Sequence, residues 1–238
     1  GTLGHQRLSI MDPVGGDQPI RSACSDRAIA ANGELYNFPQ LRPKLEADHT
    51  FRTRNDSESA LHLYEDIAEQ TAGRLDGMFA FAIADGENLY AARDAIGIKP
   101  LYFGRRDGQL VFASELKALA GLAGQVREFP PGTWFHTTLG FRSFYDVPDR
   151  PPEHLPVEQH LAELRDTLER AVAKRMMSDV PVGAFLSGGL DSSLIAAMVK
   201  QHVDELHTFS VGIQGSRDIQ AARLVAGAQA AADARGGG

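Results

Sequence analysis

The spacing of apolar residues changes character part-way along the chain. In the first part, short apolar runs bounded by turn residues predict β-strands over 28–32, 78–84, 89–92, 101–104 and 110–113. Asp85-Gly86 and Asp107-Gly108 lie between successive runs and predict hairpin turns. Asn32-Gly33 predicts another turn, at the end of the first strand. The pattern is typical of an α+β region with a large antiparallel component.

Two helices are predicted among these strands. Pro39 suits the first turn of one of them. The segment 57–70 carries Leu61, Tyr64 and Ile67 at helical spacing, which predicts a second helix with an apolar face. Helices and antiparallel strands are therefore expected in the same domain.

A proline-rich stretch follows this region. Residues 148–156 contain four prolines, and such a run fits neither a helix nor a central strand. We therefore expect a first domain over 1–147, a linker over 148–156 and a second domain over 157–238.

The second region has the pattern of a parallel βαβ unit. An amphipathic helix over 157–177 is followed by an apolar run at 180–186, a glycine turn at 187–193, a helix at 194–202 and a second apolar run at 206–213. Strand, turn, helix and strand in this order predict the start of an α/β domain with a parallel sheet.

Composition and charge narrow the classes of partner. The chain has 238 residues, 43% of them hydrophobic, and a formal net charge of −7, without a basic stripe. We therefore expect no nucleic-acid partner. No apolar run approaches the roughly 18 residues that span a bilayer, so no membrane partner is expected. One cysteine and a start without a signal-peptide pattern favour a cytoplasmic location.

The glycine turn is the strongest motif. Residues 186–193 read Leu-Ser-Gly-Gly-Leu-Asp-Ser-Ser, between an apolar run and a helix. Two glycines allow backbone N–H groups to point into one concavity, and the helix adds the positive end of its dipole. The motif is not a Walker A loop, and Asp191 could hold Mg²⁺ beside a phosphate. The alternative is an ordinary strand–helix turn with capping serines.

Asn32, Gly33 and Glu34 form a polar cluster after the first apolar run. The Asn32 side chain and the Gly33 N–H could stabilise an oxyanion, and Glu34 could accept from an ammonium or amide group. The alternative is a hairpin turn with an exposed Glu34.

Further segments occur in a fixed order around this cluster: 4–12, 52–58, 77–82, 93–102 and 113–119. Together they closely resemble the class II, N-terminal-nucleophile (Ntn) glutamine amidotransferase domain of asparagine synthetases. The loop 186–193 resembles the SGGxDS loop of the ATP-pyrophosphatase superfamily. The resemblance extends to about residue 226, and it implies an Ntn-hydrolase-like α+β fold of sandwiched antiparallel sheets with helices. The start of an α/β ATP-pyrophosphatase domain should follow.

The resemblance also implies site residues. Arg7 would bind the α-carboxylate of glutamine, Asn32 and Gly33 would form the oxyanion hole, and Glu34 and Asp56 would hold the amino group. The implied glutamine site comprises Arg7, Leu8, Ser9, Ile10, Met11, Asn32, Gly33, Glu34 and Asp56. The implied ATP site comprises Phe185, Ser187, Gly188, Gly189, Asp191, Ser192 and Val211, with Asp191 on Mg²⁺. Arg93 and Asp94 are expected to form a structural pair outside the site.

The nucleophile of that family is a cysteine at the mature N-terminus, whose own α-amine acts as base. This chain begins with Gly1, and Cys24 is internal and matches no motif, so a buried or half-exposed, non-catalytic thiol is expected there. We expect the chain to start inside the glutaminase domain, to stop early in the synthetase domain and to be inactive alone.

The implied reaction uses three small-molecule substrates: glutamine, aspartate and ATP. Glutamine is hydrolysed through a thioester, ATP with Mg²⁺ adenylates the aspartate side chain, and ammonia displaces AMP to give asparagine. The assembly is compatible with a homodimer. The alternatives are a related amide- or β-lactam-forming synthetase with a degenerate glutaminase, an amidotransferase with another carboxylate acceptor, and a non-catalytic scaffold.

Overall fold

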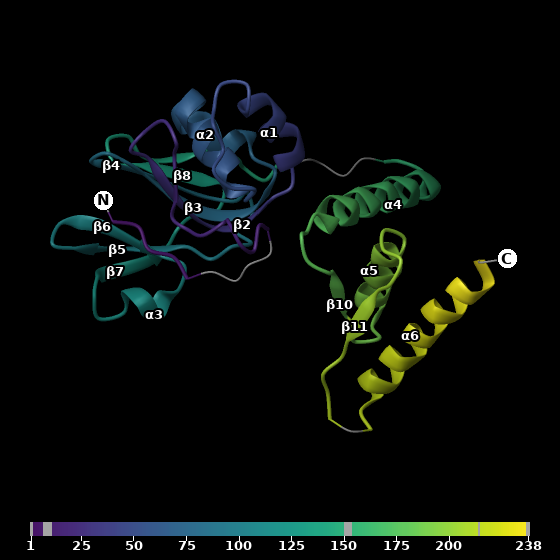
Figure 1. The fold of residues 1–238 in the computed structure, drawn as a ribbon. Coiled ribbons are helices and arrows are strands. Elements are labelled where there is room, and N and C mark those ends of the chain that lie inside the picture. The colour runs from purple at the N-terminus through teal and green to yellow at the C-terminus, as the bar shows by residue number, and fades with distance from the viewer. Residues whose placement is uncertain (1, 7–10, 150–153, 214, 237–238) are drawn as a thin grey trace. The chain divides into compact units, whose positions relative to one another are not determined.

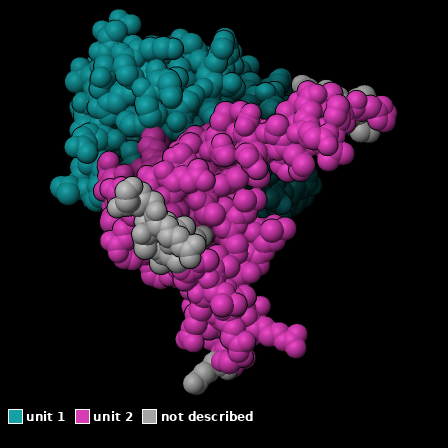
Figure 2. All heavy atoms as spheres, turned by 90° about the vertical axis from the view of Figure 1, so that its right-hand side faces the viewer, with its two compact units in different colours: residues 1–151 teal, residues 152–238 magenta. Residues whose placement is uncertain are grey.

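A computed structural model of the chain describes residues 2–6, 11–149, 154–213 and 215–236, and side chains only up to residue 228 (Figure 1). The chain divides into two compact units, Gly1–Pro151 and Pro152–Gly238, coloured separately in Figure 2. The division falls inside the proline-rich stretch.

The larger sheet of the first unit is antiparallel throughout and has the strand order β1-β2-β3-β4-β8-β9. The predicted strands at 28–32, 78–84 and 89–92 are confirmed, and each extends further than its apolar run. The strands of this sheet are β1 (Ile20–Arg21), β2 (Ala28–Leu35), β3 (Gly77–Asp85), β4 (Asn88–Arg93), β8 (Thr133–His136) and β9 (Gly140–Ser143).

Helices cover one face of this sheet (Figure 1). They are α1 (Phe38–Leu45), α2 (Ser57–Ile67) and the 3₁₀ helix η1 (Ala68–Arg74). Leu61 and Tyr64 of α2 pack with Phe79, Phe81 and Ile83, which occupy alternate positions on β3. This alternation places the aromatic side chains of the strand on the helix-covered face.

The opposite face of the larger sheet packs against a second antiparallel sheet, with the strand order β6-β5-β7. Ala80 of β3 and Phe135 of β8 share a core there with Phe103, Phe112 and Phe129. The two sheets therefore form the predicted sandwich. The smaller sheet consists of β5 (Tyr102–Arg106), β6 (Gln109–Ala113) and β7 (Gly124–Glu128), and the short helix α3 (Leu116–Leu119) follows β6.

Two local predictions in this unit are wrong. Asn32-Gly33 is not a turn, because both residues lie within β2 and pair with Ala80 and Phe79 of β3. The helix predicted over 57–70 ends at Ile67 and continues as η1, because Ala68 has a φ of 50° that an α-helix does not accommodate.

The second unit contains the predicted parallel βαβ arrangement. Strands β10 (Gly183–Phe185) and β11 (His207–Phe209) pair in parallel, and α5 (Leu190–Lys200) connects them. The other helices of this unit are α4 (Val157–Ala173), the 3₁₀ helix η2 (Lys174–Met176) and α6 (Arg217–Gly236). Together the units give the expected fold class, an α+β antiparallel sandwich followed by the beginning of an α/β domain. None of the helices in the described residues is long and apolar enough to cross a membrane.

Candidate functional site

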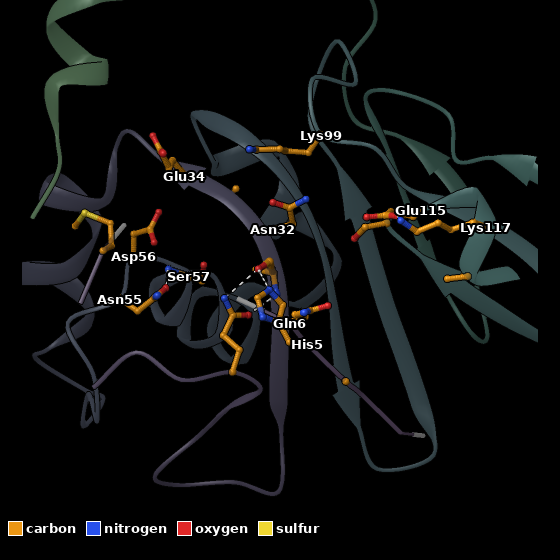
Figure 3. Close-up of a pocket in the computed structure, with 17 residues that line it drawn as sticks. His5, Gln6, Asn32, Glu34, Asn55, Asp56, Ser57, Lys99, Glu115 and Lys117 are labelled. Atoms are coloured by element: carbon orange, nitrogen blue, oxygen red, sulfur yellow. Dashed lines mark hydrogen bonds and ion pairs between the residues drawn. The ribbon is translucent and has the colours of Figure 1, made fainter. Parts of the chain in front are cut away.

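A cavity of about 540 Å³ opens in the first unit beside the end of β2. Figure 3 shows the residues that line it, which come from the segment before β1, from β2, from the start of α2, from the loop after β4 and from the start of α3. Nearly every segment used for the family resemblance reaches this cavity. The lining residues are Gly4, His5, Gln6, Met11, Gln18, Ala31, Asn32, Gly33, Glu34, Asn55, Asp56, Ser57, Lys99, Ser114, Glu115, Lys117 and Ala118.

The wall formed by β2 depends on Gly33. Its φ is 155°, a conformation that residues with a side chain rarely adopt. A Cβ there would lie 2.1 Å from the Met78 carbonyl oxygen and 2.7 Å from the Phe79 Cα on β3. Only glycine lets the two backbones approach this closely while Asn32 and Glu34 flank the cavity on either side of it.

Asp56 is a buried carboxyl group of the cavity. It is 2% exposed, precedes α2, and its Oδ2 accepts from the Leu35 N–H at 2.6 Å. Burial raises the pKa of Asp56 to about 6, and the nearby charge of Glu34 adds to the rise, although hydrogen bonds from the Leu35 and Ser57 N–H groups oppose it. An ammonium group beside Asp56 and Glu34 would offset that charge repulsion.

His5 and Gln18 fix the backbone just before Asn32. Gln18 accepts from the Ala31 N–H at 2.6 Å and donates to its carbonyl at 3.0 Å. The His5 Nε2 lies 2.9 Å from the same carbonyl, and its buried Nδ1 has no hydrogen-bond partner among the described residues. These contacts hold the strand in place where the cavity begins.

The loop that carries Lys99 is shaped by Arg93 and Asp94. Asp94 is buried and accepts from the N–H groups of Ile98 at 2.8 Å and Lys99 at 3.0 Å. Arg93 donates to the carbonyls of Lys99 at 2.7 Å and Gly97 at 2.9 Å. Both residues therefore organise this loop backbone, but the expected pairing between them is wrong, because the described ion pair of Arg93 is with Glu128 at 2.7 Å.

The cavity is chemically two-sided. In Figure 3, Glu34 and Asp56 lie on one side of Asn32, and Glu115 with Lys117 on the other. Lys117 forms an ion pair with Glu115. The acidic side suits an ammonium group, and the Asn32 amide between the two sides suits a carbonyl oxygen. This arrangement can hold an amino acid by its amino group, with its side-chain carbonyl near Asn32.

Not all predicted glutamine-site residues can be placed. Arg7, Leu8, Ser9 and Ile10 lie outside the described residues, whereas Met11 is 8% exposed and lines the cavity. Residues that the sequence interpretation did not assign also line it: His5, Gln18, Asn55, Ser57, Lys99, Glu115 and Lys117. All except Gln18 lie inside the motif segments. The sequence therefore indicated the segments that form the site, whereas the position of each residue in the cavity became clear only from the structure.

Cys24 differs from its expectation, because it is exposed and not buried or half-exposed. It lines a hollow distinct from the cavity, together with Arg21, Arg27 and Arg52. Cys24 is not among the residues that line the cavity with Asn32 and Asp56.

The glycine loop of the second unit begins α5. Gly189 is the N-cap, and Gly188 has a φ of 78°. The Ser187 and Ser192 hydroxyls lie 2.9 Å apart, and the Ser193 hydroxyl donates to the Gly189 carbonyl at 2.6 Å. A Cβ on Gly188 would lie 2.5 Å from the Ala222 nitrogen of α6, so glycine is also required by packing.

The remaining residues assigned to ATP lie near this loop. Phe185 ends β10 and is 82% exposed, and Val211 follows β11 and is 92% exposed. Asp191 is exposed in the first turn of α5. The loop therefore combines a positive-φ glycine, hydroxyl groups, an exposed carboxylate and the N-terminus of an 11-residue helix. These groups fit a polyphosphate with Mg²⁺.

Comparison with known proteins places these two regions. The family model "Glutamine amidotransferase domain" matches residues 1–137, and the model "Asparagine synthase" matches residues 163–232. The glutamine-hydrolysing asparagine synthetase 2 of Arabidopsis thaliana is 45% identical over 238 residues, covering 94% of this chain and 41% of that protein. The glutamine-hydrolysing asparagine synthetase of Zea mays is 43% identical, with 94% and 40% covered.

Among solved structures, the glutamine phosphoribosylpyrophosphate amidotransferase from B. subtilis, complexed with ADP and GMP, aligns with a TM-score of 0.47 and 24% identity. The alignment covers 85% of this chain and 52% of that one. The chain spans about two fifths of the length of the curated relatives it matches. With its first 137 residues matched by the amidotransferase model and the asparagine synthase model matching beyond them, the chain belongs to the glutamine amidotransferase domain family.

Proposed function

We propose that the chain is the glutaminase part, and the beginning of the synthetase part, of an enzyme that makes asparagine from aspartate with glutamine and ATP. The observation that carries this proposal is the convergence of Asn32, Gly33, Glu34 and Asp56 on one cavity, in the same chain as the glycine loop of α5. Relatives named glutamine-hydrolysing asparagine synthetases support it.

In the proposed glutaminase site, the ammonium group of glutamine lies against Glu34 and Asp56. Arg7 binds the α-carboxylate by charge-assisted hydrogen bonds, with Leu8, Ser9, Ile10 and Met11 beside it. The amide carbonyl points to Asn32 and the Gly33 N–H, which stabilise the oxyanion that forms when a nucleophile attacks.

The nucleophile implied by the family is an N-terminal cysteine, which attacks the amide carbon and releases ammonia as a thioester forms. Water then hydrolyses the thioester and releases glutamate. Cys24 is not a candidate, because it lines a different hollow.

In the proposed synthetase site, ATP is the substrate that activates aspartate. Ser187, Gly188, Gly189 and Ser192 donate to its phosphates, and Phe185 and Val211 lie beside its base. Asp191 would hold Mg²⁺, which neutralises phosphate charge. The aspartate side chain attacks the α-phosphorus and displaces pyrophosphate, and ammonia then displaces AMP.

The test is isotope transfer in the full-length protein. The reactants are aspartate, ATP and glutamine labelled with ¹⁵N at the amide. We expect ¹⁵N-labelled asparagine together with unlabelled glutamate, AMP and pyrophosphate. Asn32→Ala should abolish glutaminase activity and leave asparagine formation from free ammonia intact. Asp191→Ala should abolish ATP binding, whereas Asp204→Ala, an exposed acid of the same unit, should not.

The possible outcomes separate the candidate functions. Release of ¹⁵N-labelled ammonia and unlabelled glutamate without asparagine would indicate another carboxylate acceptor. ATP use without glutamine hydrolysis would indicate a lactam-forming or ammonia-dependent relative, and neither activity would indicate a scaffold. We further propose a cytoplasmic location and a homodimer, to be checked by fractionation and by sedimentation of the full-length protein.

A further inference from the structure

Behind the cavity, α2 carries a buried stripe of alternating acid and base. Glu58, His62 and Glu65 lie at helical spacing, and the side chains of Glu58 and His62 are 0% exposed. The His62 Nδ1 lies 2.7 Å from Glu65 Oε2, and its Nε2 faces Glu58 Oε1 at 3.6 Å, an ion-pair distance too long for a hydrogen bond. A neutral imidazole has one N–H group, so only a protonated ring presents a proton to both carboxylates.

Glu58 in turn fastens the segment before α2. Its Oε1 accepts from the Arg52 N–H at 2.7 Å, and its Oε2 accepts from the Thr53 N–H at 2.8 Å and the Thr53 hydroxyl at 2.6 Å. A fully buried carboxylate with three such donors shapes the backbone at these two residues.

The same segment leads into the cavity. The Thr53 hydroxyl oxygen accepts from the Asn55 N–H at 3.1 Å, and Asn55 Oδ1 accepts from the Ser57 N–H at 2.9 Å. Asn55, Asp56 and Ser57 all line the cavity. Hydrogen bonds therefore run from Glu58 through Thr53 to the residues beside Asp56, and His62 joins them through its ion-pair contact with Glu58.

Other charged groups surround the stripe. The His49 ring stacks on His62 at 4.6 Å, with its Nδ1 3.3 Å from Glu65 Oε2 and its Nε2 2.8 Å from Asp66 Oδ1. Arg27 acts on Glu65 through its charge, and Arg42 lies 4.3 Å from the Phe51 ring that meets the edge of His62.

The His49, His62 and Glu65 cluster has the composition of a metal site. Its geometry does not suit one, because the two imidazole planes lie only 25° apart. Nitrogen lone pairs lie in the plane of the ring, so two nearly parallel stacked rings do not direct them at a single ion. The cluster is better suited to holding a proton between imidazole and carboxylate groups than to binding a metal ion.

We propose that His62 is a positioning residue for the glutamine site: its protonated ring holds Glu58, and Glu58 holds the segment 52–55 that presents Asp56. This role rests on the proposed function for its effect on glutamine, but the link between His62 and the segment does not. When His62 loses its proton, Glu58 is left buried without its cation, the segment loosens and glutamine binds more weakly.

The pH range of the effect follows from the same contacts. Burial alone lowers the pKa of His62, but the charges of Glu58 and Glu65 and the hydrogen bond to Glu65 outweigh it and raise the pKa above its usual value. The stabilising contribution is therefore complete below the ordinary pKa of histidine and is lost as pH rises through the raised pKa. Glutamine affinity should fall on that alkaline side.

The test compares the full-length wild-type protein with Glu65→Gln, which keeps the shape of the side chain and removes its charge. Two quantities are measured from about pH 6 to 9: the amide-exchange protection factors of Arg52 and Thr53 without substrate, and the dissociation constant of glutamine. In Glu65→Gln both should decline at a pH lower by about one unit or more than in the wild type.

His62→Gln should weaken glutamine binding about tenfold near neutral pH, because Glu58 loses its buried counter-ion, and should remove the alkaline decline. His160→Gln, on the exposed α4 of the second unit, is the matched control and should behave as wild type. Since His62→Gln removes a buried group and could fail to fold, the result for Glu65→Gln decides the test.

Unchanged protection of Arg52 and Thr53 in Glu65→Gln across the whole pH range would overturn the inference. If protection shifts as expected but glutamine binds at no pH, the link between His62 and the segment stands and the proposed function fails. If glutamine binds but its dissociation constant does not change over the pH range in which protection shifts, His62 shapes the segment without positioning the site, and the inference is wrong.

Discussion

Asp56 must lose its proton before it can attract an ammonium group, and its burial opposes that loss. Since the pKa of Asp56 in the folded protein, about 6, lies above the ordinary value of an aspartate side chain, the folded state binds this proton more tightly than the unfolded state does. The group therefore stabilises the fold most at low pH, and about 3 kcal/mol is lost as pH rises from about 4 through 6.

Asp56→Asn should remove that loss, because an amide oxygen can still accept from the Leu35 N–H without a charge. Urea unfolding of the chain can be followed through its single tryptophan, Trp134, which lies in the core that α2 packs against. The variant should be more stable than wild type between about pH 5 and 8. The variant should also lose glutamine binding. Asp48→Asn, at an exposed site nearby, should match wild type, and a similar gain there would contradict the assignment to Asp56.

Gly33 offers a second test at the scale of one residue. Gly33→Ala places a Cβ 2.1 Å from the Met78 carbonyl, so β2 and β3 must separate, and we expect a loss of about 3 kcal/mol or more in the free energy of unfolding. Gly86→Asn, at a turn with open space and a φ of 58°, should cost little, because asparagine tolerates that conformation. Equal losses in the two variants would disprove the close-approach argument.

At the scale of elements, the sequence predicted the helices and strands whose apolar residues recur at regular spacing. The strands from 28 to 113 and the βαβ unit were found because their apolar runs are bounded by turn residues such as Asp107-Gly108. Strand β7 was missed because its sequence, GQVRE, is mostly polar and exposed. The turn at Asn32-Gly33 was predicted wrongly because the same dipeptide that favours hairpins serves here to bring two strands together. The positions of Asn55, Lys99 and Lys117 in the cavity depend on tertiary contacts that no local pattern contains.

The contact between the glycine loop and α6 gives a prediction for the second unit. Gly188→Ala would bring a Cβ within 2.5 Å of the Ala222 nitrogen, so the amides of α6 near that residue should lose protection from hydrogen exchange. ATP binding by the full-length protein should weaken with it. Gly215→Asn, at a positive-φ position with open space, should leave both unchanged, and a comparable effect there would argue against the loop–helix contact.

At the scale of the whole molecule, each hydrophobic core belongs to one unit. Leu61 lies in the core of the first unit and Val172 in a core of the second. We therefore expect Leu61→Ala to destabilise only the first unit, by about 2–5 kcal/mol, and Val172→Ala to destabilise only the second. Amide exchange resolved by unit would measure this, and a common shift of both units in either variant would show that they unfold as one.

The close approach of β2 and β3 bears on how such a site can evolve. Gly33 and Gly77 face main-chain atoms of the opposite strand at 2.1 Å and 2.3 Å from where a Cβ would stand, so backbone contacts fix the position of the strand that carries Asn32 and Glu34. Mutation cannot easily shift a strand that is held in place by main-chain contacts. The rim at Lys99, Glu115 and Lys117 carries no such constraint, and we expect changes of substrate among descendants of this domain to accumulate there.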